Sequence, residues 1–307
     1  MAHGKIIVFG SFVTDLTSRQ EGLPVPGQTL LGTSFKTGPG GKGSNQAIAA
    51  HRCGADVTMV TKVGSDVFAD MVRDFYKKEG MDTSWFFVDE FNSTGSALIM
   101  VDEKTGQNMI VVVGGACQNF TKEEVEKARP LIENASILLL QHEINFDAQF
   151  DVIRAAKKAG VTVVLNPAPA NKIPSDIIKL IDIVTPNETE AEAITGVKVT
   201  DKESAKKAAD VFFNQGVKKV VITMGKLGAY ANDGERDELL PCLPVKTIDT
   251  TGAGDAFNGG FVTALAEGKD LFEALRFGNA AGSLSTTKPG TAPSMPQRKE
   301  VDEALAQ

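Results

Sequence analysis

The feature that most constrains the fold of this chain is the alternation of short β-branched runs with longer amphipathic stretches. KIIVFG, VTMVTKVG, SILLLQ and VTVVLN have the composition and length of buried strands. Stretches with helical spacing, such as DVFADMVRDFYKKEG and FDAQFDVIRAAKKAG, follow such runs. The alternation predicts an α/β fold with a doubly wound, mostly parallel sheet and helices on both faces. A chain of 307 residues, 42% of them hydrophobic, can form one such unit, so we expect a single unit over residues 1–307.

Two segments, residues 14–37 and 95–113, interrupt this alternation. The first contains Pro24 and Pro26 followed by TLLGTSFKT, and the second has the pattern of a hairpin around DEKTG. Together they predict a small separate β-sheet inserted into the α/β domain. Because the hairpin strands are apolar on both alternating faces, both faces should be covered. We expect one face to close as a lid over an active site and the other to pair with a second copy, which predicts a homodimer through the β lid.

The composition limits the partners and the compartment. A net charge of −7 argues against a surface that binds nucleic acid or an anionic membrane. Cys53, Cys117 and Cys242 lie far apart and follow no metal-binding spacing, which favours a reducing compartment. The N-terminus has too short an apolar run for a signal peptide, and no segment has the length of a membrane span. We therefore expect a cytoplasmic protein with no nucleic-acid or membrane partner.

The stretch DTTGAGDAFNGG, residues 249–260, places Asp255 among glycines at the start of a predicted helix. Asp255 could be the N-cap of that helix, a role that stabilises a helix by about 1 kcal/mol. A cap needs no glycines before it, however, whereas Gly252, Ala253 and Gly254 could bring backbone amides together as an anion hole at the helix N-terminus. A carboxylate beside such a hole would repel phosphate unless it had another task. We interpret Asp255 as the general base of a phosphoryl transfer.

A second glycine-rich stretch, GPGGKGSNQA at residues 38–47, matches the G-x-G-x-x-G pattern of dinucleotide-binding loops. The context disagrees with that pattern, because a lid-like segment precedes the stretch and no acid follows at a suitable distance. It is also no P-loop, since Gly43 follows Lys42. The alternative is a polyol-binding loop in which Lys42 and Asn45 supply donors, although Lys42 could also be an ordinary surface lysine.

Several polar residues and one glycine follow predicted strands. They are Asp15, Glu143, Asn166, Asn187, Gly225 and Asp249. Ligands of open α/β sheets bind beyond the carboxyl ends of the strands, so we expect these residues to surround the site.

Five motifs together resemble the ribokinase-like (PfkB) carbohydrate kinase family. They are GGKGSNQAIAA, NPAPA at 166–170, PNETEAE at 186–192, ITMGKLGA at 222–229 and DTTGAGDAF. The resemblance extends from about residue 5 to about residue 300, in order and with matching spacing. It implies one kinase unit that transfers the γ-phosphoryl group of ATP to the 5-hydroxyl of D-ribose, with Mg²⁺ and with activation by K⁺.

The resemblance also implies roles for individual residues. Asp255 would accept the proton of the sugar hydroxyl, with Gly252, Ala253 and Gly254 as the anion hole. The implied sugar-binding residues are Val13, Asp15, Gly41, Lys42, Asn45, Glu143 and Asp255. The implied ATP-binding residues are Asn187, Glu190, Thr223, Gly225, Lys226, Gly228, Gly254 and Asn279, with Mg²⁺ near Asn187 and Glu190. The implied K⁺ site consists of Asp249, Thr251, Ser285, Lys288, Gly290 and Ser294.

Three of these residues also have simpler explanations. Glu143 could be an acid that interacts with the dipole of the following helix. Asn187 and Glu190 could form a capping box without any contact to ligand. Both roles are compatible for Asn187 and Glu190.

Val13 departs from a common family pattern. Many ribose-specific members have Asn two positions before the lid aspartate, whereas this chain reads FVTD. A lost hydrogen bond to a buried hydroxyl costs on the order of 1–3 kcal/mol, which weakens discrimination against 2-deoxyribose. A kinase for 2-deoxyribose or another sugar is therefore the main alternative.

Other functional classes are less well supported. A nucleoside kinase would need aromatic residues near the lid, where the chain offers Phe12 and Phe35. A non-catalytic sugar or nucleotide sensor would not need Asp255. A dinucleotide-binding oxidoreductase would need a different context for residues 38–47.

Overall fold

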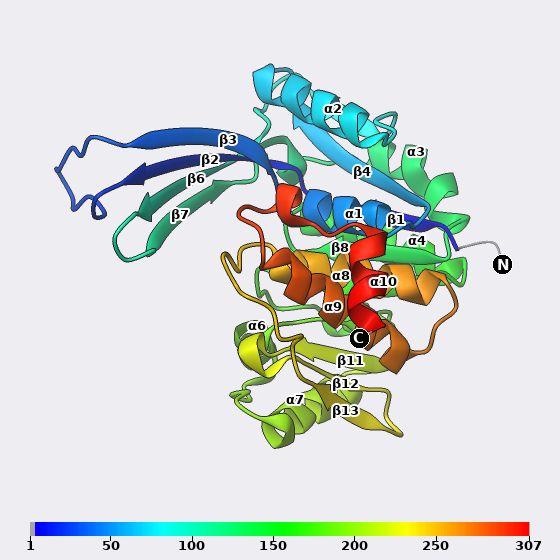
Figure 1. Ribbon diagram of the computed structural model, residues 1–307. Coiled ribbons are helices and arrows are strands. Elements are labelled where there is room, and N and C mark those ends of the chain that lie inside the picture. The colour runs from blue at the N-terminus through cyan, green and yellow to red at the C-terminus, as the bar shows by residue number, and fades with distance from the viewer. Residues whose placement is uncertain (1–3, 307) are drawn as a thin grey trace.

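The protein, described here by a computed structural model that covers residues 4–306, contains two β-sheets (Figure 1). The large sheet has nine strands in the order β13-β12-β11-β10-β9-β8-β1-β4-β5. The pairs between β11 and β5 are parallel, and β12 and β13 add antiparallel strands at one edge. The nine strands are β1 (Ile6–Phe9), β4 (Val57–Gly64), β5 (Phe86–Asp89), β8 (Ile137–Gln141), β9 (Thr162–Asn166), β10 (Ile183–Val184), β11 (Lys219–Thr223), β12 (Ala229–Asn232) and β13 (Asp237–Leu240). The predicted mostly parallel sheet is confirmed.

Helices cover both faces of the large sheet because successive strand residues point to opposite sides. Ile6 and Val8 of β1 belong to one buried cluster, and Ile7 and Phe9 belong to the other. The first cluster includes α1 (Lys42–Arg52), α2 (Val67–Glu79), α8 (Ala253–Ala266), α9 (Leu271–Ser285) and α10 (Arg298–Leu305). The second includes α3 (Lys122–Glu133), α4 (Phe146–Lys158), α5 (Ser175–Ile178), α6 (Glu188–Thr195) and α7 (Lys202–Asn214). The short 3-10 turns are η1 (Gly115–Gln118), η2 (Gly225–Leu227) and η3 (Ala292–Ser294).

The small sheet projects from one side of the molecule (Figure 1). Its order is β3-β2-β6-β7, with β2 (Val13–Gln20), β3 (Ser34–Gly40), β6 (Gly95–Asp102) and β7 (Asn108–Val113). Both interrupting segments therefore contribute strands to one separate sheet, as the pattern predicted. We call this four-stranded sheet the lid sheet.

Two residues do not lie where the strand-end rule placed them. Asp15 is inside β2 of the lid sheet, because a new strand begins at Val13, soon after β1 ends at Phe9. Asp249 lies in the loop between β13 and α8, after an antiparallel edge strand. For both residues the expectation that they follow a parallel strand was wrong.

Helices α1 and α8 cross closely at a glycine. A Cβ atom on Gly259 would lie 2.4 Å from the Cβ of Ala49 and 2.7 Å from the backbone oxygen of Gln46. The glycine thus lets the two helix backbones approach, which brings the first turn of α1 beside the first turn of α8.

No helix within residues 4–306 combines the length and the hydrophobicity needed to cross a bilayer.

Candidate active site

Two cavities lie at the ends of the sheet strands and under the lid sheet. The phosphate cavity, as we name the smaller one, has a volume of about 160 Å³ and surrounds the N-terminus of α8. It is lined by Lys42, Asn166, Ala168, Asn187, Glu190, Thr223, Thr250, Gly252, Ala253, Gly254, Asp255 and Asn258. The structure therefore brings together the predicted base, the predicted anion hole, Lys42 and four of the predicted ATP-binding residues, Gly254 being also part of the anion hole.

Asp255 is buried in the first turn of α8, but it is not the N-cap. The N-cap is Gly252, which has φ +79° and makes no side-chain capping hydrogen bond. The Asp255 carboxylate instead accepts hydrogen bonds from Asn45 Nδ2 at 2.9 Å and from Gln46 Nε2 at 3.0 Å. Each oxygen receives one amide donor, so the carboxylate has a fixed orientation toward the cavity.

Gln46 is a residue of this site that the sequence analysis did not identify. Its Nε2 donates both to Asp255 and to Asn166 Oδ1 at 3.0 Å, and its Oε1 accepts from Gln141 Nε2 at 2.7 Å. Gln46 is fully buried, and all the hydrogen-bonding atoms of its amide are used. A glutamine one position after Asn45 carries no spacing pattern of its own, which explains why it was missed.

Electrostatics raise the proton affinity of Asp255. Burial raises the pKa of its carboxyl, while Lys42 and the amides of Gln46 and Asn45 oppose that increase without cancelling it. A carboxylate with a raised pKa is a stronger proton acceptor, which suits a general base.

Lys42 is half-buried at the start of α1 and lines the phosphate cavity. Burial lowers the pKa of its ammonium, but the acids Asp255, Glu143 and Glu190 raise it above its usual value. Lys42 therefore stays charged, and its interpretation as an ordinary surface lysine was wrong.

Glu143 interacts with the N-terminus of α1. Its Oε2 accepts from the backbone N–H of Lys42 at 2.9 Å and from the hydroxyl of Ser11. These partners differ from the helix-dipole interpretation, which placed Glu143 with the following helix α4. Burial raises the pKa of Glu143, an effect that Lys42 and Ser11 partly offset.

The remaining predicted sugar-binding residues lie at the base of the lid sheet. Gly41 has φ +86°, and a Cβ atom there would lie 2.7 Å from the backbone nitrogen of Val13. Val13 is buried, so it packs at this junction. Asn45 Oδ1 is buried and has no hydrogen-bond partner among the described residues. An unpaired buried acceptor is costly, so this atom fits a hydroxyl donor from a bound polyol.

Asp15 faces the second cavity from β2. Its pKa is raised to about 6, mainly because the carboxyl is buried, while the Thr291 hydroxyl lowers it and the charges of Asp255 and Glu143 raise it further. Asp15 and Glu143 are therefore electrostatically coupled to the predicted base.

Asn187 and Glu190, predicted to lie near the phosphates of ATP, also form the capping box of α6. Asn187 Oδ1 accepts from Glu190 N at 2.8 Å, and Glu190 Oε2 accepts from Asn187 N at 2.9 Å. A parallel bridge joins Asn187 to Thr223, which places both at the wall of the phosphate cavity. The capping interpretation is confirmed, and it coexists with a cavity-lining position.

Other predicted ATP-binding residues lie outside the phosphate cavity. Gly225 and Lys226 are in η2 directly after β11, and a Cβ atom on Gly228 would lie 1.8 Å from the backbone oxygen of Leu240. Asn279 of α9 donates from Nδ2 to the backbone oxygen of Pro241 at 2.6 Å. The structure thus places Asn279 beside the loop between β13 and α8.

The residues of the predicted Mg²⁺ site fit a hydrated cation. Burial raises the pKa of Glu190, and the neighbouring acids Asp255 and Glu188 raise it further against the opposing effects of Asn187 and Lys42. A cation among these acids would relieve their repulsion. Mg²⁺ retains water ligands, so it does not need a protein cage. Within residues 4–306 no cluster of three or more His, Cys, Asp or Glu side chains has a metal-binding arrangement.

Three of the residues of the predicted K⁺ site are joined by hydrogen bonds. Asp249 accepts from Thr251 N at 2.9 Å and from Gly290 N at 3.0 Å. Burial raises the pKa of Asp249, but these hydrogen bonds bring it below the usual value, so it is ionised. A carboxylate held in a bend of backbone supplies the hard oxygen donors that a K⁺ ion needs.

The other three predicted K⁺ residues direct their side chains elsewhere. Ser285 donates to Gly282 O, Ser294 donates to Thr291 O, and Lys288 pairs with Glu300 at 2.7 Å. Their side chains therefore do not join the Asp249 cluster, and any contribution would come from backbone oxygens.

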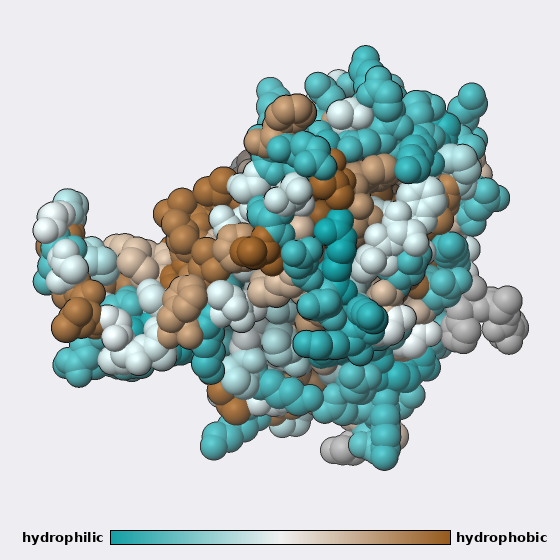
Figure 2. All heavy atoms as spheres, turned by 90° about the horizontal axis from the view of Figure 1, so that it is seen from above, coloured by the Kyte–Doolittle hydropathy of each residue, from teal (hydrophilic) through white to brown (hydrophobic). Residues whose placement is uncertain are grey.

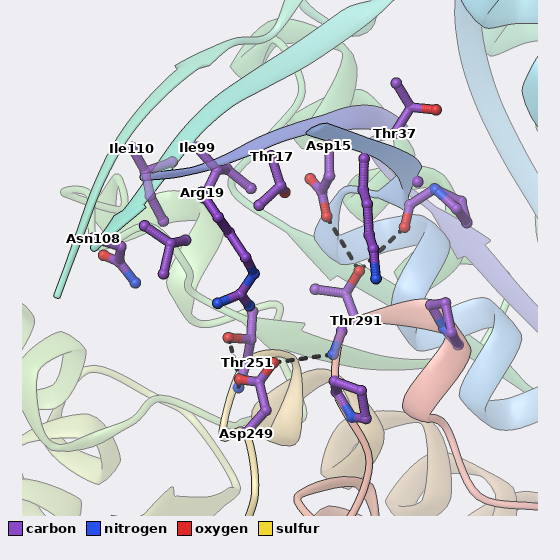
Figure 3. Close-up of a pocket in the computed structure, with 17 residues that line it drawn as sticks. Asp15, Thr17, Arg19, Thr37, Ile99, Asn108, Ile110, Asp249, Thr251 and Thr291 are labelled. Carbon is purple, nitrogen blue, oxygen red and sulfur yellow. Dashed lines mark hydrogen bonds between the residues drawn. The ribbon is translucent and has the colours of Figure 1, made fainter. Parts of the chain in front are cut away.

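The lid cavity, as we name the larger one, has a volume of about 370 Å³ (Figure 3). The lid sheet forms one wall and the loops around Asp249 and Gly290 form the other. Figure 3 shows Arg19 extending from β2 toward Asp249 and Thr251. The lining residues Thr17, Arg19, Lys36 and Thr291 were not predicted, because none of the five sequence motifs contains them.

The glycines of residues 38–47 do not form a dinucleotide loop. Gly38 and Gly40 lie in β3 of the lid sheet, and a Cβ atom on Gly40 would lie 2.4 Å from Asp15 Oδ1. The dinucleotide alternative was therefore wrong, because its turn belongs after the first strand of the large sheet.

Comparison with known proteins agrees with this geometry. Residues 3–298 match the pfkB family of carbohydrate kinases. A ribokinase from Haemophilus influenzae is 42% identical over 300 residues, which cover 98% of each chain. A deoxyribokinase from Salmonella typhi is 33% identical over 302 residues, which cover 98% of each chain.

A solved structure extends the agreement to three dimensions. The structure of Arabidopsis thaliana ribokinase complexed with ribose and ATP superposes with a TM-score of 0.91 at 33% identity and covers 100% of both chains. The match over nearly the whole chain, together with the buried acid and the glycine turn at the start of α8, shows that this chain belongs to the pfkB family of carbohydrate kinases.

Proposed function

We propose that this protein is a ribokinase that transfers the γ-phosphoryl group of ATP to the 5-hydroxyl of D-ribose, giving D-ribose 5-phosphate. The observation that carries the proposal is the position of Asp255. The carboxylate is buried, it is oriented by two amides, and it shares a cavity with the Gly252–Gly254 turn. The identity of 42% to a ribokinase over 98% of the chain supports ribose as the acceptor.

Sugar binding falls to the residues at the base of the lid sheet. Asp15, Glu143 and Asn45 offer acceptors for hydroxyl groups, and Lys42 offers a charged donor. A carboxylate can accept hydrogen bonds from two hydroxyls, which suits a polyol. Movement of the lid sheet over the sugar would exclude water that could otherwise accept the phosphoryl group.

The transfer step follows from the arrangement around α8. Asp255 accepts the proton of the 5-hydroxyl as the oxygen attacks the γ-phosphorus, and the bond to the β-phosphate oxygen breaks. The backbone amides at the start of α8 stabilise the charge on the transferred group, because they point at it before the reaction begins. Lys42 adds a positive charge on the sugar side.

Two cations belong to this proposal. Mg²⁺ bound with ATP near Asn187 and Glu190 would neutralise phosphate charge. K⁺ at the loop of Asp249, Thr251 and Gly290 would order the turn that precedes α8, since Asp249 already joins that loop to residue 290.

A 2-deoxyribose kinase is the alternative that a specific residue favours. Val13 is buried at the junction of β2, β3 and β6, pairing with Gly40 and Gly95. It cannot hydrogen-bond a sugar hydroxyl, and the deoxyribokinase match covers 98% of the chain. Ribose remains the preferred assignment because the chain is 42% identical to the ribokinase and 33% identical to the deoxyribokinase.

A homodimer through the lid sheet is also part of the proposal. Ile99 and Ile110 are cross-strand partners that line the lid cavity, so the adjacent pair, Leu98 and Val111, points to the outer face. Leu98 is 50% exposed and Val111 is 57% exposed. Figure 2 shows hydrophobic side chains gathered on the lid sheet near the body of the molecule. An apolar outer face of this kind fits a second copy.

We place the enzyme in the cytoplasm. Cys53, Cys117 and Cys242 are all unpaired thiols. Free thiols persist in a reducing compartment.

The experiment that tests the proposal is ADP release from Mg-ATP in K⁺ buffer, with D-ribose, 2-deoxy-D-ribose, D-fructose and adenosine supplied separately. Ribose-dependent release with the highest kcat/KM is the expected result. Release of ADP with another acceptor instead would support a kinase with a different substrate. Absence of ADP release with all four compounds would favour a non-catalytic sensor.

A further inference from the structure

Thr291 lies where three parts of the site meet. It follows Gly290 in the loop after α9, and its Oγ1 is 3.2 Å from Asp15 Oδ2 and 3.1 Å from the backbone oxygen of Pro39. Figure 3 shows the hydroxyl pointing from this loop to the lid sheet. Within residues 4–306, these two hydrogen bonds join a side chain of the loop after α9 to the lid sheet.

The hydroxyl of Thr291 has one proton and two acceptors. Asp15 belongs to β2 and Pro39 belongs to β3, the neighbouring strand at the base of the lid sheet. Because a hydrogen bond to a charged acceptor is stronger than one to a neutral carbonyl, the proton favours Asp15 when that carboxyl is ionised.

Asp15 has little else to orient it. Thr291 is its only side-chain hydrogen-bond partner among the described residues. Gly40 packs against the whole carboxylate, since a Cβ atom there would lie 2.4 Å from Oδ1 and 2.6 Å from Oδ2. Oδ2 is thus bound by Thr291, and Oδ1 has no donor and is free to accept from a ligand.

Thr291 also packs against the anion-hole turn. A Cβ atom on Gly252 would lie 3.3 Å from the Cα and 3.6 Å from the Cβ of Thr291. The preceding Gly290 N–H binds Asp249, which lies in the loop that leads into this turn. Thr291 therefore contacts both Asp15, the acid assigned to sugar binding, and the Gly252 turn, which is assigned to phosphate binding.

We propose that Thr291 is a positioning residue for sugar binding, whose hydroxyl fixes the Asp15 carboxylate at a set place relative to the Gly252 turn. The inference rests on the proposed function, because it assigns Asp15 to the sugar. The hydroxyl acts through Asp15 on sugar binding, while Cα and Cβ of Thr291 fill the space beside Gly252.

The test compares Thr291→Val, which keeps the shape and loses the hydroxyl, with Thr291→Ser, which keeps the hydroxyl and loses the methyl group. We expect Thr291→Val to raise the KM for ribose and the Kd for ribose without ATP, measured by calorimetry, by about tenfold. Turnover at saturating ribose should change far less, and Thr291→Ser should resemble the wild type. A greater loss in Thr291→Ser than in Thr291→Val would show a packing role and overturn the proposal.

Two further variants make the result specific. Thr287→Val removes a hydroxyl that donates within the end of α9, to Leu284 O at 2.7 Å, and should leave the KM unchanged. In an Asp15→Ala background, Thr291→Val should add no further loss of ribose binding. An equal loss in both backgrounds would contradict action through Asp15.

Measurements on the wild-type protein distinguish a failure of the proposed function from a failure of the proposed role of Thr291. Absence of ribose-dependent turnover in the wild type would contradict the proposed function. Normal turnover with equal KM values in the wild type and Thr291→Val would contradict only the role of Thr291.

Discussion

At the scale of residues, we propose that Val13 influences the choice between ribose and 2-deoxyribose. It is buried beside Gly41 at the base of the lid sheet, where it offers no hydrogen bond. We expect Val13→Asn to raise the ratio of kcat/KM for ribose to that for 2-deoxyribose by about tenfold, because one added hydrogen bond to a hydroxyl is worth about 1 kcal/mol or more. Val13→Leu is the control, since it changes size without adding polarity. An unchanged ratio in Val13→Asn would remove Val13 from the determinants of specificity.

The raised pKa of Asp15 predicts that ribose binding depends on pH. Burial and the charges of Asp255 and Glu143 raise its pKa to about 6, while Thr291 lowers it. Above that pH the carboxylate is ionised and accepts sugar hydroxyls, and below it the carboxyl is protonated and binds them less well. Ribose affinity measured by calorimetry should therefore fall as the pH decreases through about 6. The Asp15→Asn variant should bind ribose weakly, and its affinity should depend less on pH. A fall in the ribose affinity of the wild type only near the ordinary pKa of aspartate would contradict the assignment.

The sequence predicted the charged residues of the site and one orienting amide, Asn45, but it missed two other orienting residues, Gln46 and Thr291. Asp255 and Lys42 stand in distinctive glycine-rich motifs, so their types and spacing identify them. Gln46 and Thr291 act through contacts with residues more than 200 positions away in the chain, to Asp255 and Asp15 respectively. Such contacts depend on how the elements pack, and local patterns do not contain that information.

At the scale of elements, the crossing of α1 and α8 sets the geometry around Asp255, the proposed base. Gly259 allows the approach, and the approach brings Asn45 and Gln46 of α1 within hydrogen-bonding distance of Asp255 of α8. The strand and helix types followed from sequence periodicity. The depth of this crossing did not, because it depends on one glycine that looks like any other in a helix.

Gly259→Ala tests that crossing. An added methyl group would meet Ala49 at 2.4 Å, so α1 and α8 must separate. We expect a loss of about 1–3 kcal/mol in the free energy of unfolding and a Tm lower by several degrees, measured by calorimetry. Turnover should fall as well because Asn45 and Gln46 move from Asp255. Gly38→Ala, where a Cβ atom would meet nothing within 4 Å, is the control, and equal Tm values for the two variants would contradict the close-packing argument.

At the scale of the whole molecule, the β6–β7 hairpin of the lid sheet has apolar side chains on two faces with different environments. The inner face lines the lid cavity through Ile99 and Ile110, and the outer face exposes Leu98 and Val111. The hairpin pattern predicted both faces. Which face turns inward depends on how the sheet joins the body, and only the structure supplies that.

Val111→Asp tests the proposed dimer. A charge on the outer face should prevent a second copy from covering it, because a buried unpaired carboxylate is strongly unfavourable. Sedimentation velocity should show a dimer for the wild type and a monomer for Val111→Asp. Leu305→Asp is the matched control, since Leu305 is 42% exposed on α10, which lies in the body of the molecule and not in the lid sheet (Figure 1), and this variant should remain dimeric. A monomeric wild type would contradict the dimer.

The measurement that tests the central claim most directly is NMR of the product formed from ¹³C-labelled D-ribose and Mg-ATP by the wild type and by Asp255→Asn. We expect phosphorus coupling at C5 with the wild type, and product formation slower by about 10²-fold or more with Asp255→Asn while ribose still binds. Phosphate on another carbon would contradict the assigned acceptor hydroxyl. Product formation by Asp255→Asn at the wild-type rate would contradict the role of Asp255 as the base.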